Sequence, residues 1–176
     1  VRAQQIHATA KGNVTLQTDV DSINVTTTLA GYIAIAESDA VTLESLDSHD
    51  GPVTVVSGGQ MTAVSVDTSN TDDDSNDITL TATSNGLIIA EIEAGGQNDV
   101  TLSAPGSTIQ STSDSSKVTA DVLTATAGGS IELYTDVEYL VLATSQTGDI
   151  TVVETDSVSL TNLTAHDGTI AVSAGG

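Results

Sequence analysis

Aliphatic and polar residues alternate along almost the whole chain in short runs. A turn residue, one arbitrary residue and an aliphatic–x–aliphatic pair recur at Gly12, Gly31, Gly51, Asn76, Asn98, Gly129, Gly148 and Gly168. Alternation at period two between Gly, Asn and Asp residues predicts β-strands. No segment of helical length has an apolar i, i+3, i+4 stripe, so we expect almost no helix.

These starts are separated by 19, 20, 25, 22, 31, 19 and 20 residues, so the base period is 19 to 20. Residues 31–53 return as 148–170, at an offset of 117, with ten of 23 identical. A β-sandwich could use strands of this spacing, but its strands meet different environments. In a solenoid each coil meets the same environment and keeps the same pattern.

The sequence therefore predicts an all-β, right-handed parallel β-helix (solenoid) with coils of about 19–20 residues. We interpret residues 1–176 as a single solenoid segment, and we expect it to be part of a longer array. Two polar stretches, near 67–77 and 104–117, lengthen single coils and are predicted to be loop insertions.

The composition is strongly acidic: 24 Asp and Glu face three basic residues, for a net charge of −21. Such a charge disfavours nucleic acid as a partner. No run of 18 apolar residues occurs, so we expect no membrane insertion. Only three aromatic residues, all Tyr, are present, which suits a narrow core of Val, Ile and Leu.

The G-x-[IV]-x-[LIV] start, the following V-x-L-x-x-L strand and the period resemble the repeats of filamentous-haemagglutinin-type large exoproteins. The resemblance covers residues 12–176. It implies a right-handed parallel β-helix and a secreted or surface-anchored bacterial adhesin, with no catalytic residues to carry over. The secretion domain of two-partner-secreted members and an Arg-Gly-Asp motif do not occur in this sequence.

Two His-Asp-Gly turns end the duplicated segment, at His49–Asp50 and His166–Asp167. A histidine beside a carboxylate can bind a metal or act as a general base. Asp before Gly is also a common turn pair, so both turns are interpreted as the same corner of the same repeat.

Carboxylates recur at the turn between the two strands of a unit: Asp19 and Asp21, Glu37 and Asp39, Asp136 and Glu138, Glu154 and Asp156. Stacked coils would bring them into columns, where Ca²⁺ could relieve their repulsion. The alternative is a solvated acidic edge that prevents aggregation.

The densest acidic run is "TDDDSND", from which Asp72, Asp74 and Asp77 are predicted as a possible calcium site. Their spacing is not that of an EF-hand loop, and a flexible acidic loop is the alternative.

An enzyme is not expected, because a polysaccharide lyase needs a basic residue in a cleft and sugar platforms use aromatic rings. We expect a non-enzymatic structural segment of an extracellular bacterial adhesin or fibre. Its partners would be neighbouring coils of the same or identical chains and host or cell-surface glycans. A small subunit that polymerises end to end into a filament is the alternative, and a carbohydrate-active β-helix enzyme domain is a weaker one.

Overall fold

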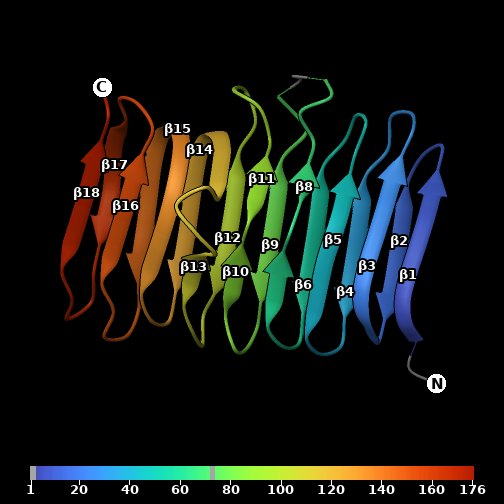
Figure 1. The fold of residues 1–176 in the computed structure, drawn as a ribbon, viewed down its shortest axis with the longest axis horizontal. Helices are drawn as coiled ribbons and strands as arrows, with labels where there is room; N and C mark the ends of the chain where they lie inside the picture. The colour runs from blue at the N-terminus through green and yellow to red at the C-terminus, as the bar shows by residue number, and fades with distance from the viewer. Residues whose placement is uncertain (1–2, 72–73) are drawn as a thin grey trace.

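The computed structural model describes residues 3–71 and 74–176. In this part of the chain all regular structure is β, and no helix is long and apolar enough to cross a bilayer. Figure 1 shows the strands side by side in one long stack, with the N- and C-termini at opposite ends. The strands are β1 (Ala3–Ala10), β2 (Val14–Thr18), β3 (Val20–Thr27), β4 (Ile33–Glu37), β5 (Val41–Asp47), β6 (Val53–Ser57), β7 (Met61–Ala63), β8 (Val66–Asp67), β9 (Ile78–Ala82), β10 (Leu87–Ile89), β11 (Glu91–Glu93), β12 (Val100–Ala104), β13 (Ile109–Ser111), β14 (Lys117–Ala127), β15 (Ile131–Thr144), β16 (Ile150–Glu154), β17 (Ser159–Thr164) and β18 (Ile170–Ala174).

The strands pair in parallel with strands one coil away, so the chain winds through about eight turns of a β-solenoid. For example, β4 lies between β2 and β6, with Ile33 opposite Val14 and Val53. Parallel pairing without helical crossovers requires the chain to return around a coil before it pairs again. The prediction of an all-β parallel solenoid is confirmed.

Inward-facing aliphatic side chains form the core as continuous columns. One column consists of Val14, Ile33, Val53, Ile78, Val100, Leu123, Leu140 and Leu160. A second consists of Val41, Met61, Leu87, Ile109, Ile131, Ile150 and Ile170. All but the last member of each column are buried. Each coil thus buries its apolar face against its two neighbours, which no single coil could do alone.

The repeat units do not all begin on the same side of the solenoid. The first five starts precede members of the first column, whereas Ile131, Ile150 and Ile170 belong to the second. Steps along the first column are 19, 20, 25, 22, 23, 17 and 20 residues, so the register changes in the long coils near the middle. Strands with alternating aliphatic residues fit into both columns, so a repeat unit can begin with a strand of either column.

The two polar stretches behave differently. In 67–77, only Asp67 lies in a strand, and the other described residues connect β8 to β9. The stretch 104–117, expected to be an insertion loop, contains β13, which pairs with β10 and β15. Ile109 is buried there and continues the second column. Burial of this side chain in the core stabilises a strand even though the residues around it are polar.

Glycine at the unit starts allows coils to approach closely. A Cβ on Gly31 would lie 2.5 Å from the carbonyl carbon of Gly12, and one on Gly148 would lie 2.5 Å from that of Gly129. These contacts are with backbone atoms of the preceding coil, which cannot move aside without disturbing the ladder. Close stacking therefore requires glycine at Gly31 and at Gly148.

Candidate functional site

A buried glutamate lies at the corner where β4 ends. Glu37 is 4% exposed, and its carboxylate accepts the backbone N–H of Val20, on the preceding coil, at 3.2 Å. It also accepts the N–H of Ser38 at 2.9 Å. The Ser38 N–H also donates to the Thr18 carbonyl at 3.1 Å, whereas the corner directs the Val20 N–H to a side chain, since an unpaired buried N–H is costly. Glu37 therefore ties two consecutive coils together.

The duplicated unit builds the same arrangement at Glu154, 117 residues later. This side chain is 3% exposed and accepts the N–H of Val137 at 3.3 Å and the N–H of Thr155 at 2.8 Å. The Thr135 hydroxyl donates a further bond of 2.7 Å. Repetition of the contacts at equivalent positions shows that the local sequence determines this corner.

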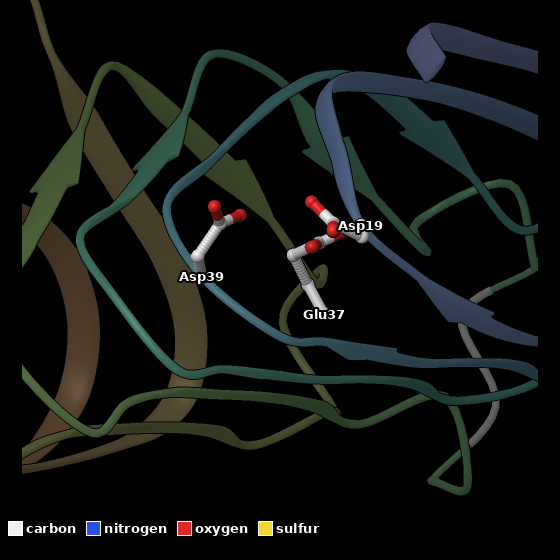
Figure 2. A group of neighbouring side chains, drawn as sticks. All are labelled: Asp19, Glu37 and Asp39. Atoms are coloured by element: carbon white, nitrogen blue, oxygen red, sulfur yellow. The ribbon is translucent and has the colours of Figure 1, made fainter. Parts of the chain in front are cut away.

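Two aspartates complete a carboxylate cluster around each glutamate. Asp19, Glu37 and Asp39 each offer an oxygen within 4.8 Å of the others, and Asp136, Glu154 and Asp156 do the same. Figure 2 shows the first cluster, with Asp19 from one coil beside Glu37 and Asp39 from the next. The predicted gathering of corner carboxylates by stacking is confirmed for these six residues. Asp21 and Glu138 are in neither cluster.

Oxygens this close together could share a hard divalent cation, because Ca²⁺ binds oxygens at about 2.3–2.6 Å. In each cluster, however, the glutamate oxygens already accept backbone N–H groups. The contacts present explain both glutamates as structural ties between coils, and the calcium hypothesis stays a prediction.

The second cluster contains an ion pair. Lys117 Nζ lies 2.8 Å from Asp136 Oδ2, and this hydrogen bond raises the pKa of the Lys117 ammonium. Asp136 and Asp156 line an open groove of about 420 Å³ together with Thr119 and Tyr139. The second cluster thus carries a positive side chain from its own chain.

Part of the predicted acidic calcium site can be located. Asp72 lies outside the described residues. Asp74 and Asp77 are exposed, and Asp77 Oδ1 accepts the N–H of Asp99 at 2.9 Å. Within 3–71 and 74–176, neither belongs to a group of three or more potential ligands. A site at Asp72, Asp74 and Asp77 stays a prediction.

Asp77 also affects the pKa of a neighbouring carboxyl group, that of Asp99. The pKa of Asp99 is raised, first by partial desolvation and then by the negative charge of Asp77. Asp149 shows the opposite behaviour, because the backbone N–H and hydroxyl of Thr169 lower the pKa of its carboxyl group.

The His-Asp-Gly turns share local contacts but occupy different sides of the solenoid. His49 N–H donates to Thr27 Oγ1 at 3.0 Å, and His166 N–H donates to Thr144 Oγ1 at 2.8 Å. The first turn precedes Val53, in the first core column, and the second precedes Ile170, in the second. The interpretation of both as the same corner is wrong, because the register changes between them. Both histidines are exposed.

Sequence reasoning missed the burial of the two glutamates. The signal was present in the alternation, because Glu37 follows Ile33 and Ile35 at the same spacing and must face inward as they do. Glu154 follows Ile150 and Val152 in the same way. An inward carboxylate at the end of an aliphatic strand indicates a capped corner.

Comparison with known proteins gives no further assignment. No protein-family model, curated protein or solved structure matches the chain. The fold and these contacts are therefore the basis for any functional conclusion.

Proposed function

We propose that this chain is a non-enzymatic structural segment of a secreted or surface-anchored bacterial adhesin or extracellular fibre. In this role it is a stiff rod that holds an attachment site away from the cell. The observation that carries the proposal is the continuous parallel pairing from β1 to β18 over unbroken aliphatic columns. A ladder in which each coil pairs with the next resists bending and extension along its length.

The chemistry of the corners supports a mechanical role over a catalytic one. Glu37 and Glu154, the most buried acids described, accept backbone hydrogen bonds between coils. Lys117, one of three basic residues in the chain, is paired with Asp136. These groups stabilise contacts between coils. A lyase or glycosidase would instead need acids and bases directed at a substrate.

The resemblance of the repeats to filamentous-haemagglutinin-type exoproteins supports the extracellular location. The acidic surface agrees with it, because a net charge of −21 keeps a repetitive β-protein soluble and protects its outer faces from aggregation. Glycans on host or neighbouring cells are the proposed targets of the complete adhesin.

The test is made on intact cells of the source organism. Antibodies raised against this chain are expected to label unpermeabilised cells, and external protease is expected to remove the label. Deletion of complete coils is expected to reduce cell attachment while leaving growth unchanged. Label found only after permeabilisation, or attachment unaffected by the deletion, would contradict the proposal.

A further inference from the structure

One side of the solenoid carries threonine at matching positions in four consecutive coils. Parallel pairing aligns the outward residues of β6, β9, β12 and β14 in two columns: Thr54, Thr79, Thr101 and Thr124 in one, and Val56, Thr81, Ser103 and Thr126 in the other. We call this surface the threonine face. All four strands pair on both sides, with β4 before β6 and β15 after β14, so the face lies within the stack and not at an end of it.

The alignment of these threonines results from the strand register. Steps along the first of the two columns are 25, 22 and 23 residues, which differ from one another and from the base period of the repeat. The coils absorb the extra residues in their turns, and each strand returns to the same position on this side. Threonines at unequal spacing in the sequence therefore form a regular array in the molecule.

The threonine face is uncharged, although the chain has a net charge of −21. Alanine and valine continue it at the outward positions paired with it in β4 and β15. Asp77 and Asp99 border the face, directly before β9 and β12. Another outward column has four acidic members among five: Asp47, Asp67, Glu93, Thr119 and Asp136. The acidic residues are thus concentrated on other sides and at the edge of this face.

The hydroxyl groups of this face are free to contact a ligand. Threonine hydroxyls at the corners, such as that of Thr83, donate to backbone carbonyls of a neighbouring coil. On the threonine face, Thr126 Oγ1 lies 3.5 Å from Ser103 Oγ, and among residues 3–71 and 74–176 the other five threonine hydroxyls of the face have no protein partner. Each of these groups can both donate and accept a hydrogen bond.

Backbone geometry determines the distances within the array. Strands of neighbouring coils lie about 4.8 Å apart, and alternate residues of one strand lie about 6.6 Å apart, which is two steps of about 3.3 Å. Water oxygens on the prism faces of hexagonal ice repeat on a rectangular grid of similar dimensions. Threonine is β-branched and stiff at χ1, so the ladder holds its hydroxyl and methyl groups in fixed positions. A rigid array of this kind loses little conformational entropy when it contacts an ordered surface.

We propose that the threonine face binds ice. Its hydroxyl groups hydrogen-bond to water at lattice positions, and its methyl groups together with Val56 exclude disordered water from the contact. Absence of charge is required, because an ion orients the surrounding water around itself and disrupts the lattice. The inference goes beyond the proposed rod function, since it assigns a ligand to one side of the rod.

The first experiment grows ice slowly in a solution of the 176-residue chain and measures the fraction of protein that enters the ice. Thr101→Lys is compared with Thr151→Lys. Both threonines are exposed at the second position of a five-residue strand, but Thr151 lies on another side, between Glu132 and Ala171. The chain and T151K are expected to enter the ice. T101K is expected to enter at least about tenfold less, because its side chain protrudes from the contact plane. Equal incorporation of T101K and T151K, or exclusion of the unaltered chain, would overturn the proposal.

The second experiment observes a single ice crystal in each protein solution. The chain and T151K are expected to give the crystal flat facets and to lower its freezing temperature below its melting temperature, whereas T101K leaves a round disc with no such gap. Round discs in the unaltered chain would contradict binding to a specific ice plane. Circular dichroism and thermal melts check that T101K is folded, and Thr79→Lys on the neighbouring coil replaces it if it is not, with the same outcomes expected.

A protein surface packed on the threonine face is the alternative occupant. Sedimentation velocity of the unfrozen chain tests it, and a monomer is expected at the concentrations of the ice experiments. Oligomers that T101K abolishes, in a chain that ice excludes, would assign the face to protein association and overturn the inference. Ice binding is measured on the purified chain, so its failure with surface labelling intact would contradict only this inference. Ice binding without surface labelling would contradict the extracellular role.

Discussion

Glu37 is a charged residue whose burial is compensated by the backbone. Replacement by Ala removes the side-chain acceptor of the Val20 N–H, whereas the Ser38 N–H keeps its bond to the Thr18 carbonyl at 3.1 Å. Leaving a buried donor unpaired costs about 1–3 kcal/mol, so we expect Glu37→Ala to lower the free energy of unfolding by that amount. Glu37→Gln keeps an acceptor oxygen and removes a charge next to Asp19 and Asp39, so its loss is expected to be smaller.

Urea unfolding measures both variants, with Glu44→Ala as the control. Glu44 is an exposed acid in β5, and its replacement is expected to change stability by less than about 0.5 kcal/mol. If E37A and E44A were equally stable, the buried carboxylate would not tie the coils together.

Gly31 offers a test of close stacking. A methyl group there would meet the backbone of Gly12 at 2.5 Å, so Gly31→Ala forces two coils apart. We expect a loss of at least about 2 kcal/mol, since overpacking typically costs about 1–3 kcal/mol and rigid backbone cannot yield. The control is Gly96→Ala, where a Cβ has no atom within 4 Å. Thermal melts should separate the variants by several degrees, and equal melting temperatures would contradict the stacking argument.

At the scale of elements, the acidic edge beside β9 and β12 responds to pH. The folded-state pKa of Asp99 is raised, so the folded chain takes up this proton more readily than the unfolded chain. This carboxyl group therefore destabilises the fold when it is ionised, and the penalty is relieved as pH falls through the raised pKa toward 3.8. Solvent screens an exposed carboxylate, so the effect is on the order of a few tenths of a kcal/mol.

We expect Asp99→Asn to raise the melting temperature slightly at pH 7 and to have less effect at pH 4. Asp149→Asn is expected to change the melting temperature in the opposite direction. The lowered pKa of Asp149 contributes stability above its ordinary value of 3.8, and that contribution is lost as pH falls through the folded pKa. Asp149→Asn should lower the melting temperature at pH 7. Melts of both variants between pH 3 and pH 8 test the signs, and a shift in the same direction for both at pH 7 would contradict them.

The coil corners also determine what removal of divalent cations should do. The glutamates of both clusters are satisfied by backbone donors, and Lys117 is paired with Asp136. We expect EDTA to leave the melting temperature of the chain unchanged within about 2 °C, because backbone N–H groups already satisfy both buried glutamates. A fall of more than about 5 °C, reversed by added CaCl₂, would instead support calcium in the carboxylate clusters.

At the scale of the whole molecule, stability should vary along the rod. Central strands such as β9 and β12 pair on both sides, whereas among residues 3–71 and 74–176 β1 and β18 pair on one side only. In a solenoid each coil is stabilised only by its neighbours, so end coils open first. Hydrogen exchange at low salt should be at least about 100-fold faster for amides of β1 and β18 than for those of β9 and β12. Equal protection would indicate that the rod unfolds as one unit.

The extent of sequence-based prediction differs between parts of the molecule. Alternating aliphatic residues and glycines at 19 to 20 residues were sufficient for the parallel solenoid, because every coil repeats one local pattern. Repetition also brought Asp19 and Glu37 together, since stacked turns place like residues side by side. The inward position of Glu37 was readable from its spacing after Ile33 and Ile35, although only the structure identified its partners.

Sequence alone determined the class of fold, the period of the coil and the acidic character of its edges, which depend on local pattern and composition. Tertiary structure decided the register. It placed Ile131 and Ile150 beneath Ile109 and not beneath Val100, and it moved the second His-Asp-Gly turn to another side. It also made a strand of Ile109–Ser111 within a polar stretch. The physical reason is that similar aliphatic columns on different sides of a solenoid compete for each strand, and only the packing of all coils together selects one.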